Sequence, residues 1–150
     1  TKGRWIDAAL HSLLTTNKAH ADILRNFAPS AVTDITGFGL LGHGLEIASA
    51  SGVTLSLDAQ TLPLFDGVTE VLLKGTRASL HAENARGFAL NPEDPKQLVL
   101  ADPQSSGGLL IALNPDQAPA FEQACRQADL PLWSIGSCQA PGASGPTLIF

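Results

Sequence analysis

Apolar residues recur every three or four positions over 1–27, which is the spacing of a buried helical stripe. The polar stretch 15–17 interrupts this spacing and supplies an N-cap, so two helices are predicted, the second ending at Pro29. The same period predicts three further helices, over 40–50, 64–73 and 115–128.

Shorter segments have the pattern of strands. Residues 53–57 alternate between apolar and polar side chains, which predicts a strand with one buried face. Residues 109–113 form a short apolar run that also predicts a strand. Other strands are predicted over 31–36, 132–138 and 147–150. The last two are expected to pair as a closing hairpin.

Between 75 and 103 the apolar period weakens, and Asn91-Pro92 and Asp94-Pro95 are turn signals. This stretch is therefore predicted to be a long surface excursion. Because strands occur both before and after helices, the sequence favours an α/β (α+β) sandwich over a helical bundle.

Length and composition exclude several classes of protein. The 150 residues predict one domain, and 44% apolar with 15% charged residues exclude a disordered chain. The net charge of -5 and the scattered basic residues argue against a nucleic-acid partner. No apolar run is long enough to span a membrane, and nothing at the N-terminus reads as a signal peptide. Two cysteines, Cys125 and Cys138, fit a reduced, cytoplasmic setting and are expected to be structural. A chain that starts at Thr1 without an initiator Met is expected to be a processed product or a piece of a longer one.

Gly37, Gly39 and Gly42 make a GxGxxG pattern, the fingerprint of dinucleotide-binding domains. A predicted strand precedes it, a helix follows, and Asp58 lies at the distance of a ribose-binding carboxylate. The strand before the pattern is too polar for a central parallel strand, however. About 30 residues of predicted helix precede it, and regular βαβ units do not follow. The dinucleotide hypothesis is therefore disfavoured.

The glycine loop still has the physical character of an anion site. Glycines let the backbone approach a ligand, and a helix N-terminus offers free N–H groups. Asp34, just before the loop, would repel a phosphate unless a cation lay between them, which suggests a Mg²⁺ bridge. The alternative is that Asp34 is a turn or capping carboxylate and that the glycines only relieve crowding. The residues alone leave both open.

Two long motifs carry a resemblance to a known family. Residues 33–43, TDITGFGLLGH, resemble the TD(V/I)TGFGLLGH motif of selenophosphate synthetases, which are selenide, water dikinases. Residues 102–110, DPQSSGGLL, are similar to that family's DPQTSGGLL motif, with Ser105 where Thr is usual. The resemblance covers nearly the whole chain but only the C-terminal half of the family's proteins. It implies the fold of aminoimidazole ribonucleotide synthetase C-terminal domains, a mixed, largely antiparallel sheet covered by helices.

The resemblance also implies roles for particular residues. Asp34 matches the family aspartate that ligates Mg²⁺ at the ATP phosphates, whereas Thr36, Gly37, Phe38 and Gly39 match the loop that shapes the nucleotide cleft. The family converts selenide, ATP and water to selenophosphate, phosphate and AMP. Its nucleophile and catalytic Lys belong to the N-terminal half, which is expected to be missing here. This chain alone is therefore expected to be inactive, and the full-length protein to be a cytoplasmic homodimer.

Rival hypotheses remain beside this one. A related ATP-dependent kinase or synthetase would use another acceptor, such as thiamine phosphate or a purine precursor. A non-catalytic binding or assembly module would keep the fold and use the cleft for contacts. His43 and Glu46 are spaced to reach one metal, although a surface pair is favoured. Residues 105–108 could form a second anion loop, although a tight turn is favoured.

Overall fold

The computed structural model describes residues 2–150, in which helices alternate with short strands. The helices are α1 (Gly3–Leu14), α2 (Lys18–Leu24), α3 (Gly39–Ser51), α4 (Val68–Leu73), α5 (His81–Asn84), α6 (Pro95–Leu100) and α7 (Ala118–Gln127), with a 3₁₀ turn η1 (Ala59–Thr61). The strands are β1 (Ala31–Asp34), β2 (Thr54–Leu57), β3 (Leu109–Ala112), β4 (Gly136–Gln139) and β5 (Thr147–Ile149).

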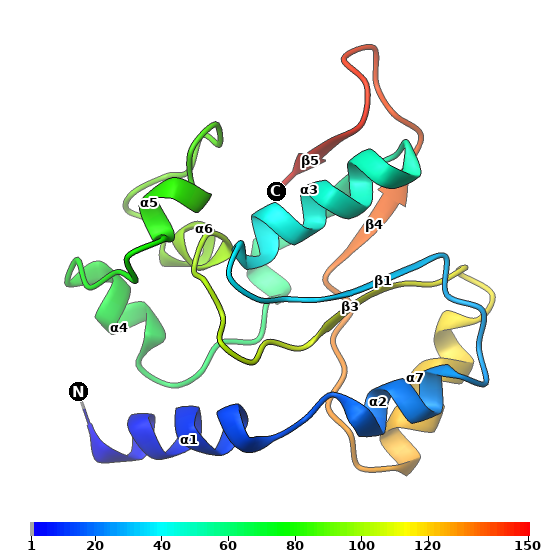
Figure 1. Ribbon diagram of the computed structural model, residues 1–150, viewed down its shortest axis with the longest axis horizontal. Coiled ribbons are helices and arrows are strands. Elements are labelled where there is room, and N and C mark those ends of the chain that lie inside the picture. The colour runs from blue at the N-terminus through cyan, green and yellow to red at the C-terminus, as the bar shows by residue number, and fades with distance from the viewer. Residues whose placement is uncertain (1) are drawn as a thin grey trace.

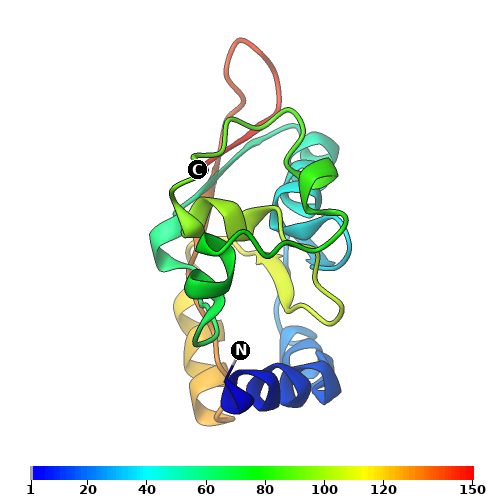
Figure 2. The same ribbon diagram turned by 90° about the vertical axis from the view of Figure 1, so that its left-hand side faces the viewer.

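The strands form two separate small sheets. β1 pairs with β3 in an antiparallel ladder. β2 lies between β4 and β5, antiparallel to the first and parallel to the second. Figures 1 and 2 show α3 running beside these strands, with α4, α5 and α6 gathered at one end of the molecule and α2 and α7 at the other. The α/β class predicted from the sequence is confirmed, with its mixed sheet divided in two.

The predicted closing hairpin is wrong in its pairing. The turn itself forms, because the Gly145 amide donates to the Gly142 carbonyl at 3.0 Å. Beyond that turn the two strands separate, and β2 lies between them. Both faces of β2 are covered in part, rather than the one face predicted from its alternation, because Thr54 is buried as well as Leu55 and Leu57.

The predicted surface excursion over 75–103 is wrong in part, because many residues over 75–93 are exposed but the stretch also supplies core. It contains α5 and α6, and Leu98, Leu100 and Ala101 are buried. Leu100 packs in the larger of two core clusters, with Leu41 of α3 and the strand residues of β2. The apolar period is weak here because each helix is only one or two turns long, too short for the period to repeat.

A second, smaller core cluster joins α2 to α7. It consists of Leu24, Phe121 and Cys125, with partly buried residues packed around it. Phe27 meets Phe121 edge to face, with ring centroids 5.2 Å apart. The two cysteines are free, Cys125 buried and Cys138 exposed. Within residues 2–150, no helix is both long and apolar enough to cross a membrane.

Several boundaries differ from the prediction. α4 begins at Val68 rather than 64, after Gly67 takes a left-handed conformation with φ of 84°. α7 begins at Ala118 rather than 115, because the Asn114 side chain first closes a turn by accepting the Asp116 amide. Gly52 does end α3 in the left-handed conformation, as glycine commonly does at this position.

Candidate functional site

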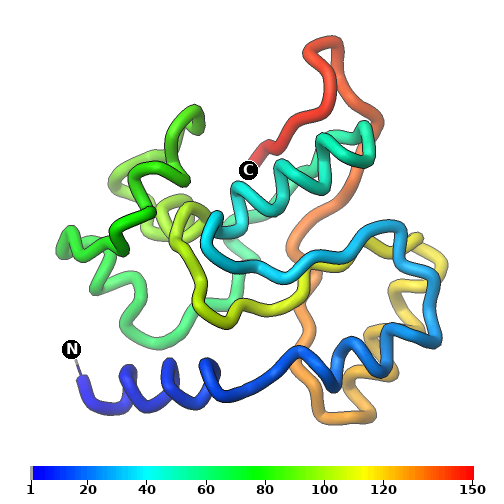
Figure 3. Tube along the Cα trace, viewed as in Figure 1, coloured from blue at the N-terminus to red at the C-terminus, as the bar shows by residue number. Residues whose placement is uncertain are grey.

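The two long motifs, residues 33–43 and 102–110, lie side by side although residues 44–101 separate them in the sequence. Asp34 stands opposite Leu109 where β1 pairs with β3. The ladder continues beyond the strands, because the Ile35 amide donates to the Gly108 carbonyl and the Gln104 amide to the Thr36 carbonyl, both at 3.0 Å. Figure 3 shows these two stretches of chain running together across the middle of the molecule. The motifs therefore form one structural unit.

Two glycines make this close approach possible. A Cβ at Gly107 would overlap the carbonyl oxygen of Ile35. Gly39 has a φ of 65°, and a Cβ there would lie 2.9 Å from the Leu100 carbonyl oxygen and 3.0 Å from that of Asp102. Position 39 therefore requires glycine for two reasons: the backbone is left-handed there, and a side chain would collide with the backbone at the end of α6. The structure thus gives both glycines a packing role within residues 2–150.

Asp34 closes β1 with an exposed side chain. Within the described residues, no hydrogen bond or ion pair engages its carboxylate. A free carboxylate at a loop fits one ligand of an oxygen-bound cation such as Mg²⁺. Residues 2–150 do not, however, gather three or more His, Cys, Asp or Glu side chains into a metal site. Asp34 can supply only part of a coordination shell.

A chain of hydrogen bonds runs through the start of α3. His43 Nε2 lies 3.1 Å from Thr36 Oγ1, and His43 Nδ1 lies 3.0 Å from a carboxylate oxygen of Glu46. The sequence predicted that His43 and Glu46 form a pair on the surface. Glu46 is exposed as predicted, but His43 is only 8% exposed. Its spacing of three residues from Glu46 places both on one side of the helix, as expected.

Phe38 covers one side of this arrangement. Its ring centroid lies 5.5 Å from that of His43, although the Phe38 side chain is itself exposed. The position of Gly42 leaves room for it, because a Cβ there would lie 2.5 Å from Cβ of Phe38. Gly37 has open space at its Cβ direction.

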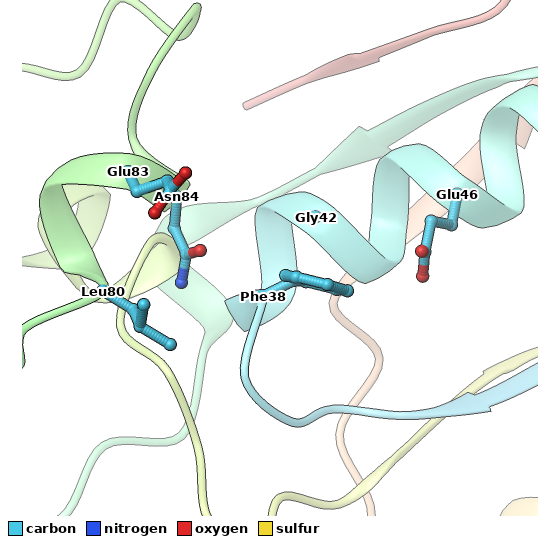
Figure 4. Close-up of a pocket in the computed structure, with 6 residues that line it drawn as sticks. All are labelled: Phe38, Gly42, Glu46, Leu80, Glu83 and Asn84. Atoms are coloured by element: carbon cyan, nitrogen blue, oxygen red, sulfur yellow. The ribbon is translucent and has the colours of Figure 1, made fainter.

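An open pocket of about 330 Å³ lies beside Phe38. Figure 4 shows Leu80 and Asn84 on the α5 side of it and Phe38, Gly42 and Glu46 on the α3 side. This volume is at the lower end of the range for small-molecule pockets, which suits part of a ligand better than a whole nucleotide. Of the five residues predicted for the site, Phe38 alone lines it.

Two polar residues that the sequence did not single out also belong to this region. Asn84 donates to the Gly37 carbonyl at 2.9 Å and to the Ala101 carbonyl at 3.1 Å, which ties the glycine loop to α6. Burial raises the pKa of the Asp102 carboxyl, while nearby His81 and the Gln104 amide act to lower it. Asp102 is the first residue of the second motif, and this position is the signal by which the sequence could have indicated it. Nothing local could have indicated Asn84.

The glycine pattern does not belong to a dinucleotide-binding domain. That fold requires the strands on either side of the helix to lie parallel in one sheet. Here β1 and β2 flank α3 but lie in different sheets. The dinucleotide hypothesis is excluded by topology, in agreement with the polar strand.

Comparison with known proteins gives one matching family model and many relatives. The model of the AIR synthase related protein, C-terminal domain, matches residues 8–148. A selenide, water dikinase of Trichlorobacter lovleyi is 38% identical over 138 residues, which cover 89% of this chain and 40% of the relative. That of Colwellia psychrerythraea is 40% identical over 122 residues, or 79% of this chain and 35% of the relative. That of Nitratidesulfovibrio vulgaris is 35% identical over 139 residues, or 89% and 40%. The chain thus spans well under half the length of these relatives.

Proposed function

The chain belongs to the AIR synthase related family, whose C-terminal domain it carries, and we propose that it forms part of a selenide, water dikinase. Within that enzyme Asp34 would be one ligand of Mg²⁺ at an ATP site, with the loop over Thr36, Gly37, Phe38 and Gly39 forming one wall of the nucleotide cleft. The acceptor of the phosphoryl group would be selenide, and the products selenophosphate, phosphate and AMP.

One observation carries this proposal above the others. Two motifs shared with selenophosphate synthetases meet in one backbone ladder, which leaves Asp34 exposed at the end of β1. Relatives named selenide, water dikinase align over most of the chain. Metal ligands need to be held on regular backbone structure, and the pairing of β1 with β3 holds Asp34 in this way.

The residues of this chain would bind and orient rather than react. Phosphoryl transfer depends on positioning and on neutralising the charge of the phosphate oxygens, which is the chemistry that Mg²⁺ supplies when bound. Asp34 would hold one side of the cation, and Phe38 beside the pocket would exclude water from the cleft. The remaining ligands and the nucleophile would come from the rest of the protein.

The proposal is tested by measuring the turnover of the full-length protein, as the rate at which AMP forms from ATP in the presence of selenide. Asp34→Asn keeps the size of the side chain and removes its charge, so we expect turnover to fall by about 10- to 100-fold or more with little change in melting temperature. Asp116→Asn, an exposed change away from both motifs, serves as the control. Unchanged turnover in Asp34→Asn would remove this residue from the site. Formation of ADP from ATP with thiamine phosphate as the acceptor, and no AMP with selenide, would instead assign another acceptor.

A further inference from the structure

Helix α1 has three sides of different character. One side is partly buried, and its residues are three or four positions apart: Trp5, Ala8, Ala9 and Ser12. A second side is exposed and polar, with Arg4, Asp7 and His11. The third side, called here the aliphatic stripe, consists of Ile6, Leu10, Leu13 and Leu14. The four residues of the stripe are between 47% and 85% exposed, although they are the largest apolar residues of α1 apart from the tryptophan.

The first turn of α1 contacts the loop before α4. The Trp5 ring lies directly on Gly67, where a Cβ would overlap it. Arg4 and Asp66 form an exposed ion pair at 3.9 Å. Within residues 2–150, both core clusters are built without any residue of α1. Figure 1 shows the helix lying along the lower edge of the molecule.

The aliphatic stripe is the side whose burial would stabilise α1 most. A helix of 12 residues is marginal in water by itself and depends on packing its apolar side. No side chain caps its N-terminus, and its first turn carries no acidic residue. Its partly buried side offers mainly small side chains for packing, whereas the leucines and the isoleucine face water. An apolar side in this position is typical of a helix that a further part of the protein covers.

The relatives indicate which part that is. The match covers 40% of the Trichlorobacter lovleyi protein, so more than half of such a protein lies outside it. The matching family model describes a C-terminal domain and begins at residue 8, inside α1. The helix therefore lies at the border between this domain and the segment that precedes it in a full-length relative.

We propose that the aliphatic stripe is a docking surface for the segment that precedes residue 1 in the full-length protein. The surface of that segment is expected to be apolar where it meets Leu10 and polar toward Asp7 and His11, which would stay in water. This inference rests on the proposed function only in that the chain is part of a longer protein.

The size of the stripe favours a covalently linked occupant over a second copy of the chain. Its four side chains offer on the order of 300 Å² of apolar surface. A specific interface between separate proteins buries about 800 Å² on each partner. A linked segment needs less contact, because the linkage keeps it at an effective concentration of about a millimolar.

The first test measures how well α1 is protected in the full-length protein, by amide hydrogen exchange and mass spectrometry. Leu10→Asn makes a stripe residue polar at similar size, and should speed exchange of the α1 amides by about 10-fold or more. His11→Asn makes the same replacement on the neighbouring polar side and is the matched control. It should change the rate by less than about threefold. Equal effects of the two variants would overturn the proposal.

The second test identifies the occupant. The photoreactive residue p-benzoylphenylalanine, placed at position 10 of the full-length protein, should give on illumination a product with the mass of one chain, linked to a peptide that precedes residue 1. The same replacement at position 11 should give little of this product. A product of twice the mass would assign the stripe to a second copy and overturn the proposal. A link within residues 2–150, or no link, would overturn it as well.

The two proposals fail in different ways. If the full-length protein made no AMP from ATP and selenide but position 10 still linked to the preceding segment, the dikinase assignment would fail and the docking surface would stand. If the protein turned over normally and position 10 linked to nothing outside residues 2–150, the docking surface would fail alone.

Discussion

Asp102 is a carboxylate that water reaches only in part. Burial raises the pKa of its carboxyl above the ordinary value of 3.8, and the Gln104 side chain, 3.2 Å from one of its oxygens, offsets this only partly. Between the ordinary and the raised pKa, the folded protein binds more protons than the unfolded chain. The free energy of unfolding therefore falls as pH rises through that interval.

Replacing Asp102 by asparagine removes this titration. We expect the free energy of unfolding of Asp102→Asn to increase relative to that of the wild type as pH rises from below 3.8 toward neutrality. Urea unfolding at a series of pH values measures the difference. A difference that stayed constant, or that moved the other way, would show that the buried carboxylate carries no such cost.

At the scale of elements, β1 and β3 can approach each other only because residue 107 is a glycine. Gly107 lies against the carbonyl of Ile35, where a Cβ has no space, whereas the neighbouring Gly108 has none of the surrounding atoms within 4 Å of its Cβ direction. The two motifs can approach only because the first of these glycines has no side chain. The pair offers a matched comparison of adjacent residues.

Gly107→Ala should push β1 and β3 apart and lower the free energy of unfolding by about 1–3 kcal/mol, the usual cost of overpacking. Gly108→Ala should change it by less than about 1 kcal/mol, in either direction. Denaturant unfolding of both variants measures this. Equal effects at the two positions would contradict a packing role for Gly107.

Across the whole molecule, the two core clusters share no buried residue, although neighbouring residues of β3 pack against both, Leu110 against the first and Ile111 against the second. Leu100 belongs to the cluster around α3 and β2, and Phe121 to that between α2 and α7. Figure 1 shows the β1–β3 ladder crossing between the two regions. The clusters should respond to substitution independently if the ladder does not transmit strain.

Leu100→Ala should cost about 2–5 kcal/mol, because it leaves a cavity in a fully buried site. Phe121→Leu, a smaller change in the second cluster, should cost on the order of 1 kcal/mol. The double variant should equal the sum of the two within about 0.5 kcal/mol. Urea unfolding checks this, and a larger deviation would show that the clusters are coupled through β1 and β3.

The sequence by itself determined features that rest on neighbouring residues. Two N-terminal helices and the stop of α3 at Gly52 formed as predicted. The second helix ends at Leu24, before Pro29, the strand predicted over 31–36 ends at Asp34, and α1 buries none of its residues. The α/β class also formed as predicted, because the order of short strands and helices is visible along the chain. The candidate residue Asp34 came from its motif, and the structure left its carboxylate exposed.

Only the tertiary structure decided which distant segments meet. The helix α6 supplied core residues, β2 came to lie between β4 and β5, and Glu46 was joined through His43 to Thr36. Burial of α6 and the pairing of strands depend on contacts between residues far apart in sequence. Periodicity records only which face of a segment is apolar and not what covers it, so these outcomes needed the folded molecule.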